Sequence, residues 1–182
     1  MSKRKNNLII IENGRIRTCL LDEKNVWEIG RPSKEEKPDI SFRSATVSRK
    51  HGRLENVDGI WFYLDYNGKN GTVYNGKHIV AGRNGRTKPV MLSEGDVLIL
   101  GGGEQAVINH KTIWVMFMTR CHEGMWQVLD TKGVKKITVS DGEETQCFEN
   151  PEKGTVVSMQ KGIAIYMGDI TYLIGELNVT GE

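Results

Sequence analysis

The spacing of apolar residues along the chain is the feature that most limits its possible folds. No stretch repeats apolar residues at helical spacing over a dozen positions, whereas short runs rich in β-branched and aromatic residues recur throughout. Runs such as LIII at 8–11, IWFYLDY at 60–66 and IWVMFM at 113–118 are separated by turn sequences such as ENG, NVDG and SEGD. The pattern predicts an all-β protein built as a sandwich of two sheets.

One of these runs also indicates which side chains share a face. In IWFYLDY, Trp61, Tyr63 and Asp65 occupy alternate positions. Because side chains alternate across a strand, these three should point to the same side of the sheet.

The 182-residue chain is long enough for one domain with an appendage or for two small domains. The sequence TRCHEG at 119–124 follows the last long apolar run. It suggests a boundary between a domain at 1–119 and a β-rich appendage of unknown role at 120–182. An appendage of about 60 residues is thin for an independent core, so we expect it to pack on the first domain.

Charge divides unevenly between these two parts. Residues 1–119 carry 19 Lys/Arg and 13 Asp/Glu, whereas residues 120–182 carry 6 and 10. The positive excess in the first part suggests an anionic partner, although such a division is often only a property of the solvated surface.

The three cysteines, Cys19, Cys121 and Cys147, are odd in number and far apart, with no Cys-x-x-Cys pair. Cys121-His122 is an isolated doublet. Cysteines of this kind predict reduced, buried thiols in a cytosolic protein, without a metal site.

No segment has the character of a membrane anchor. The apolar run at 8–11 is too short for a signal-peptide core, and the run at 113–118 is too short to span a bilayer. We therefore expect a soluble cytoplasmic protein without direct membrane insertion.

Four groups of polar residues and glycines stand where predicted strands end. In chain order they are Gly30-Arg31, Ser48-Arg49-Lys50-His51, Asn70-Gly71-Thr72 with Asn75-Gly76, and the LSEGD segment at 92–96. A phosphate dianion is bound best by convergent donors, namely a guanidinium fork, a hydroxyl and backbone amides. Loops can present all three, whereas a flat strand cannot.

In this order and at these separations, Gly-Arg, Ser-x-x-His, Asn-Gly-Thr-x-x-Asn-Gly and Leu-x-x-Gly-Asp resemble the forkhead-associated (FHA) domain. The resemblance extends over about residues 8–119. It implies an eleven-stranded β-sandwich whose loops at one end bind phosphothreonine peptides. It implies neither catalytic activity nor a cofactor.

The resemblance also implies a role for each matching residue. Arg31 would meet the phosphate, Ser48 would donate its hydroxyl to a phosphate oxygen, and Asn70 would bind the peptide main chain. Arg49 would offer its backbone N–H, and its side chain could contact phosphate or peptide. Arginine suits this task because its charge is permanent and its donors are bidentate, and asparagine carries both a donor and an acceptor.

A second set of matching residues would support the binding loops rather than touch the ligand. His51 would brace its loop from within, and the others would shape the turns. The set consists of Gly30, His51, Gly71, Thr72 and Asn75.

The chain departs from the family pattern at two places. Family members often carry Ser-Thr before the Asn-Gly-Thr, and here Gly68 and Lys69 stand there. A hydroxyl is lost and a cation is gained, so Lys69 joins the predicted binding residues and could favour an acidic residue or a second phosphate. The segment AGRNGRTKP at 81–89 also reads as an enlarged basic loop, which would attract anions if it lay at the binding end.

We interpret the chain as a non-catalytic signalling module that recruits a phosphothreonine-bearing substrate of a Ser/Thr kinase. Ser48 and His51 lack a third residue of a catalytic triad, which argues against an enzyme. The basic segments are short and not interleaved with aromatic residues, which argues against nucleic-acid binding. A phosphorylation-independent interaction or assembly module on the same fold remains the alternative, and the oligomeric state stays open.

Overall fold

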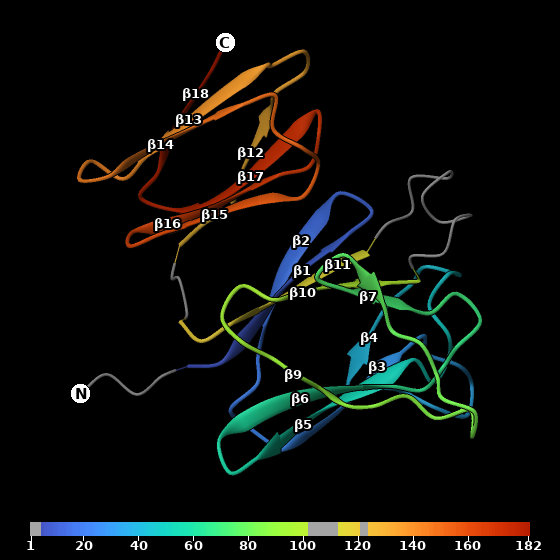
Figure 1. Cartoon of the computed structure of the whole chain (residues 1–182). Helices are drawn as coiled ribbons and strands as arrows, with labels where there is room; N and C mark the ends of the chain where they lie inside the picture. The colour runs from blue at the N-terminus through green and yellow to red at the C-terminus, as the bar shows by residue number, and fades with distance from the viewer. Residues whose placement is uncertain (1–4, 102–112, 121–123) are drawn as a thin grey trace. The chain divides into compact units, whose positions relative to one another are not determined.

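The computed structural model describes residues 5–101, 113–120 and 124–182, and in these ranges every regular element is a β-strand (Figure 1). The all-β class predicted from the sequence is therefore confirmed. The chain divides into two compact units, Met1–Cys121 and His122–Glu182. The packing of the second part of the chain on the first stays a prediction.

The first unit contains two sheets. The first sheet has the order β2 (Arg15–Leu20), β1 (Asn7–Glu12), β11 (Ile113–Met118), β10 (Val97–Leu100), β7 (Thr72–Tyr74) and β8 (Lys77–His78). The second has the order β4 (Ile40–Ser41), β3 (Val26–Gly30), β5 (Gly52–Val57), β6 (Ile60–Asp65) and β9 (Val90–Met91). Strands β3 and β4 run parallel, whereas the other paired strands of these two sheets run antiparallel. The described residues of this unit thus form an eleven-stranded sandwich, as the FHA resemblance implies.

The core of the first unit lies between its two sheets. It includes Leu8 and Ile10 from one sheet and Ile29, Leu54 and Tyr63 from the other, none of them more than 1% exposed. Each fully buried side chain of this size contributes about 1.5–3 kcal/mol of transfer free energy. The core therefore holds the two sheets, and the loops at their ends, in a fixed arrangement.

Strand β6 buries the face that its alternation predicts. Trp61, Tyr63 and Asp65 are 2%, 0% and 4% exposed, respectively. Asp65 is thus a polar group inside the sandwich, where it needs hydrogen-bond partners.

Two-residue turns connect three of the strand pairs. Asn13-Gly14, Asp58-Gly59 and Asn75-Gly76 join β1 to β2, β5 to β6 and β7 to β8, with positive φ values between 45° and 85°. Two successive residues in this region form the type I′ turn, whose twist matches that of the adjoining strands. The Asn-Gly and Asp-Gly pairs of the sequence therefore fix the register of these hairpins.

The second unit is a smaller pair of sheets. One has the order β12 (Gln127–Asp130), β17 (Ile170–Gly175), β16 (Gly162–Tyr166) and β15 (Thr155–Met159). The other has the order β14 (Thr145–Glu149), β13 (Lys136–Ser140) and β18 (Asn178–Gly181). Ile137 and Val139 from the second sheet pack with Val157, Ala164 and Leu173 from the first, so this unit has a core of its own.

The prediction of buried thiols is wrong for the two cysteines in the described ranges. Cys19 is half-buried and Cys147 is exposed, and both are free. Each lies on an edge strand, β2 or β14, and an edge strand is covered less completely than a central one. Burial still raises the pKa of the Cys19 thiol. Cys121 and His122 lie outside the described residues.

Among the described residues, no helix is long and apolar enough to cross a membrane. The same residues contain no group of three or more His, Cys, Asp or Glu side chains placed to hold a metal ion.

Candidate functional site

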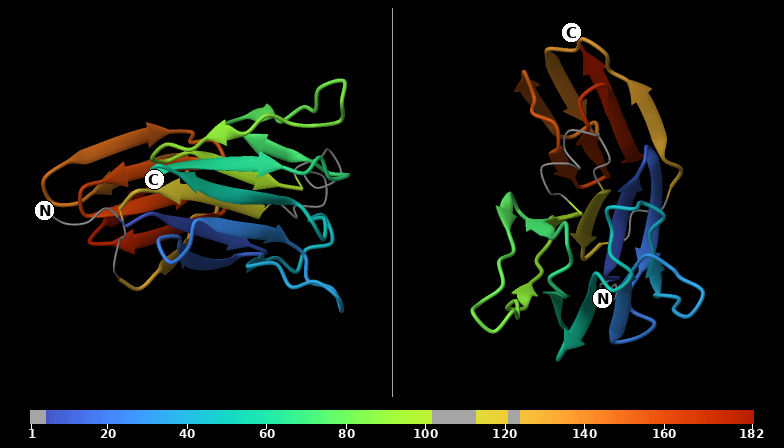
Figure 2. Two further views of the ribbon diagram at one scale, coloured as in Figure 1. Left: turned by 90° about the horizontal axis from the view of Figure 1, so that it is seen from below. Right: turned by 90° about the vertical axis from the view of Figure 1, so that its right-hand side faces the viewer.

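Three loops at one end of the first unit carry the residues that the sequence singles out (Figure 2). They are the β3–β4 loop at 31–39, the β4–β5 loop at 42–51 and the β6–β7 loop at 66–71. Arg31 N donates a hydrogen bond to Ser48 O at 3.0 Å, and Tyr66 N donates to His51 O at 3.0 Å. These backbone bonds connect the three loops into one surface.

Gly30 allows the first two loops to approach each other. A Cβ atom on this residue would overlap the carbonyl oxygen of Arg49 and lie 3.1 Å from that of Ser48. Both are backbone atoms, which cannot turn aside as a side chain can. The position therefore requires glycine because of the close approach of the chain.

Arg31 is held at the junction of these loops. Its side chain is half-buried, and Nε donates to Val47 O at 3.2 Å. No described residue accepts a hydrogen bond from its two terminal nitrogens. The guanidinium is thus oriented by one bond while its outer face keeps the donors that a bidentate anion would use.

Ser48 lies between Arg31 and the β6–β7 loop. Its carbonyl accepts from Arg31 N, and a Cβ atom on Gly68 would overlap its Oγ. The hydroxyl therefore lies directly against the backbone of residue 68. This contact brings Arg31, Ser48 and the β6–β7 loop together.

Asn70 joins the β6–β7 loop to the β4–β5 loop by its side chain. Its Nδ2 donates to Thr46 O at 3.0 Å. Oδ1 can accept a main-chain N–H from a peptide, and the second N–H of Nδ2 can donate to a main-chain carbonyl.

A buried hydrogen-bond network lies beneath the loops. His51 is fully buried, and its Nδ1 accepts from Ser48 N at 3.2 Å. Nε2 therefore carries the proton and donates to Thr72 Oγ1 at 2.9 Å. Thr72 Oγ1 donates in turn to Asp65 Oδ2, which also accepts from Tyr63 OH at 2.9 Å. Burial lowers the pKa of His51 even though Asp65 acts in the opposite direction, so the neutral imidazole is favoured.

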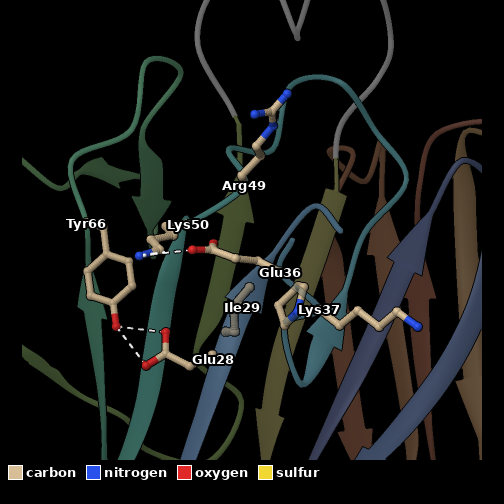
Figure 3. A pocket seen from close by; sticks show the side chains of 8 residues that line it. Glu28, Ile29, Glu36, Lys37, Arg49, Lys50 and Tyr66 are labelled. Atoms are coloured by element: carbon tan, nitrogen blue, oxygen red, sulfur yellow. Dashed lines mark hydrogen bonds and ion pairs between the residues drawn. The ribbon is translucent and has the colours of Figure 1, made fainter. Parts of the chain in front are cut away.

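Arg49 and Lys69 are both exposed. In Figure 3 the side chain of Arg49 points away from the neighbouring ion pair between Lys50 Nζ and Glu36 Oε1, which are 3.2 Å apart. The side chains of Lys50 and Glu36 are 71% and 47% exposed, so this pair contributes little to stability. The side chains of Arg49 and Lys69 are thus solvated cations on the β4–β5 and β6–β7 loops.

The comparisons with known proteins agree with this arrangement. Residues 27–101 match the family described as the FHA domain. The chain contains an FHA domain. This module is non-catalytic and typically binds phosphothreonine in protein–protein interactions.

Solved structures show the same fold. Full-length yeast Pml1p is 23% identical, with 64% of this chain and 83% of that chain covered and a TM-score of 0.52. The FHA domain of an Arabidopsis thaliana hypothetical protein is 21% identical, with 69% and 93% covered and a TM-score of 0.51. At these identities the likeness concerns the fold alone. No curated protein matches the chain.

The structure does not bring Asn75 to the three loops of the FHA domain. Its Oδ1 accepts from Val97 N at 2.8 Å and its Nδ2 donates to Asp96 Oδ1 at 2.9 Å. Its contacts thus join the β7–β8 hairpin to the start of β10. Gly71 and Thr72 do lie at the site, where Gly71 adopts a positive φ of 63° and Thr72 belongs to the buried network.

The basic loop at 81–89 is tied to the end of β6. Thr87 is 8% exposed, and its Oγ1 donates to the carbonyl oxygen of Asp65 at 2.6 Å. Arg83, Arg86 and Lys88 are exposed around it. Because Asp65 also belongs to the network beneath the loops, these charges lie at the same end of the domain as Ser48.

Sequence reasoning missed the roles of Asp65 and Thr87. The alternation in β6 offered a signal for Asp65, since it placed a carboxyl group on the same face as two large aromatic residues. Thr87 had no such signal, because its importance depends on how a long loop returns to the sheet.

Tyr66, the first residue of the β6–β7 loop, donates its OH to both carboxylate oxygens of Glu28 on β3, at 3.0 and 2.8 Å (Figure 3). Burial and these bonds to Glu28 raise the pKa of Tyr66 to about 12. The tyrosine therefore remains a donor at neutral pH and orients the Glu28 side chain in a pocket that Glu36, Arg49 and Lys50 also line.

Proposed function

We propose that the FHA domain of this chain binds a phosphothreonine-bearing segment of a partner protein. The partner would be a substrate of a Ser/Thr kinase, and the chain would act by recruiting it rather than by catalysis. The residues that would bind the phosphopeptide are Arg31, Ser48, Arg49, Lys69 and Asn70.

The arrangement of Arg31 carries this proposal. One of its nitrogens is anchored to Val47 O, and the hydroxyl of Ser48 lies on the adjoining loop. Asn70 fixes the loop that carries Ser48 through its bond to Thr46 O. A guanidinium, a hydroxyl and an amide held by one connected set of loops can meet a phosphate and its peptide with little reorganisation.

The expected affinity follows from the number of such contacts. A hydrogen bond to a charged group contributes about 1.5–3 kcal/mol net. Three or four of them give about 8 kcal/mol, the free energy of a micromolar complex, only where ordering costs are small. We therefore expect dissociation constants in the micromolar range or slightly lower.

The test is titration of the full chain with a degenerate fluorescent phosphothreonine peptide library and with matched threonine and phosphoserine libraries. Arg31→Ala removes the central guanidinium. Lys132→Ala is the matched control, because it removes one exposed positive charge from the second unit. We expect binding that requires the phosphate, prefers phosphothreonine, and is lost in Arg31→Ala but retained in Lys132→Ala.

Binding that requires neither the phosphate nor Arg31 would contradict the proposal. It would instead support the phosphorylation-independent interaction or assembly module. The oligomeric state of the chain would then be the next measurement.

A further inference from the structure

A basic pocket lies where the two sheets of the FHA domain leave an open side. Strand β2 is an edge of the first sheet and β4 is an edge of the second. Between them is a pocket of about 740 Å³, lined in part by Arg15 and Arg17 from β2 and by Arg43 directly after β4. Three arginine residues thus line one hollow of the surface.

The pocket also contains one carboxylate, which is held by backbone hydrogen bonds. Glu12 also lines it, and its Oε2 accepts the backbone N–H groups of Arg43 and Ser44 at 3.0 and 3.1 Å. No described residue forms an ion pair or hydrogen bond with the side chains of Arg15 and Arg43. Three arginines and one glutamate line the pocket, so its net charge is positive.

Arg17 is oriented within the pocket. Its Nη2 donates to Ser41 O at 2.6 Å, and its guanidinium lies 5.2 Å from the centre of the Phe42 ring. Phe42 is fully buried, so this platform is rigid. A guanidinium held on an aromatic face loses less freedom when it binds an anion.

The pocket adjoins the loops of the proposed phosphothreonine site. Pro32, which lines it, directly follows Arg31. Ser41, which also lines it, pairs with Gly30 across the β3–β4 ladder. An extended peptide advances about 3.3 Å per residue, so the side chain of a residue near the phosphothreonine in the peptide could lie beside this pocket.

We propose that Arg15, Arg17 and Arg43 form a second anion site, which receives a phosphate or carboxylate group of the same phosphothreonine-bearing segment. The inference rests on the proposed function. It differs from the role considered for Lys69, which lies on the β6–β7 loop and offers a single solvated cation. The second site would make the FHA domain prefer partners phosphorylated twice or flanked by acidic residues.

The first experiment compares singly phosphorylated peptides with peptides that carry a second anion. Each flanking position in turn receives phosphoserine or aspartate, so that the two sources of negative charge are distinguished. In the unaltered chain we expect a gain of about tenfold, equivalent to about 1.4 kcal/mol, at one or two positions. The gain should be larger for phosphoserine, which carries more charge and three acceptor oxygens.

The double variant Arg15→Ala/Arg43→Ala should reduce this gain to about twofold or less while leaving the affinity for the singly phosphorylated peptide unchanged. Arg17 is left in place because it also contacts the backbone of β4. The control Lys132→Ala/Lys153→Ala removes two exposed positive charges from the second unit. An equal loss in both double variants, or no gain at any position, would overturn the proposal.

A second experiment separates this inference from the proposed function. In the Arg31→Ala chain, inorganic phosphate is titrated while the Nε–Hε resonances of the arginines are followed by NMR. Shifts at Arg15, Arg17 and Arg43 would support the anion site even if no phosphothreonine peptide binds. Unchanged resonances at millimolar phosphate would overturn it even if singly phosphorylated peptides bind normally.

Discussion

Thr72 is the residue at which the buried network beneath the binding loops can be tested most cleanly. Its Oγ1 lies 2.9 Å from His51 Nε2 and 3.1 Å from Tyr63 OH, and it donates to Asp65 Oδ2. Thr72→Val keeps the shape of the side chain and removes the hydroxyl. Because valine and threonine have nearly the same shape, the substitution tests the hydrogen bonds with little steric change.

The expected cost follows from the groups left without a partner. His51 Nε2–H loses its acceptor, and the imidazole cannot reverse its tautomer because Nδ1 must accept from Ser48 N. Asp65 Oδ2 loses one bond but keeps that from Tyr63 OH. A buried donor without a partner costs about 1–3 kcal/mol, and the lost bond to Asp65 adds about 1 kcal/mol, so we expect a destabilisation of about 2–4 kcal/mol.

The measurement is urea unfolding read by peptide-resolved hydrogen exchange, which reports on each unit separately. With a denaturant slope of about 2 kcal/mol per molar, the midpoint of the first unit should fall by about 1–2 M. Thr171→Val is the matched control, because Thr171 is also 1% exposed but its hydroxyl makes only a 3.4 Å contact with Thr131 Oγ1. If Thr72→Val lowers the free energy of unfolding no more than Thr171→Val does, the network does not stabilise the loops.

Three further predictions concern the same loops. Gly30→Ala should destabilise the first unit by more than about 2 kcal/mol and abolish phosphopeptide binding, because the new Cβ overlaps backbone atoms. In unfolding and titration experiments the control Gly82→Ala, whose Cβ meets nothing closer than 3.4 Å, should show little change in stability or binding. Because the pKa of His51 is lowered in the folded state, its contribution to stability is complete above about pH 6.5 and is lost as the pH falls through the folded-state pKa. The free energy of unfolding should therefore decrease less steeply from about pH 7 to about pH 5 in His51→Gln than in the unaltered chain. Gly68→Ala should force the Ser48 hydroxyl into another rotamer and weaken phosphothreonine binding about tenfold, with a stability change within about 1 kcal/mol. Equal affinities of the Gly68→Ala variant and the unaltered chain would count against a role for this hydroxyl.

The sandwich could be predicted from the sequence because the patterns that indicate strands and turns involve only neighbouring residues. The alternation of Trp61, Tyr63 and Asp65 requires only the two-residue period of a strand, and the Asn75-Gly76 turn requires only the tolerance of these residues for positive φ. The burial of the thiols depended instead on which strands lie at the sheet edges. That order is set by pairing between distant segments, so Cys19 and Cys147 could not be placed from their neighbours.

The candidate site likewise has parts that neighbouring residues predict and parts that depend on distant segments. The motifs predicted which loop residues would carry the donors, because Arg31, Ser48 and Asn70 each stand in a short recognisable stretch. They did not predict the basic pocket at the open side. Arg15 and Arg17 lie on β2 of one sheet, and Arg43 directly follows β4 of the other. Because β2 and β4 belong to different sheets, these arginines come together only when the two sheets stack.

Gly68 departs from the family pattern in a way that the structure explains. By sequence, a hydroxyl that family members often carry is lost there. In the structure, a Cβ atom on residue 68 would overlap Ser48 Oγ and lie 3.1 Å from Ser48 Cβ, so Ser48 itself occupies the space that a larger residue would need. A serine or threonine at position 68 and Ser48 in its present rotamer exclude each other. The glycine is therefore the condition for Ser48 to lie between Arg31 and the β6–β7 loop, and restoring a family-like Gly68→Ser should weaken phosphothreonine binding rather than strengthen it.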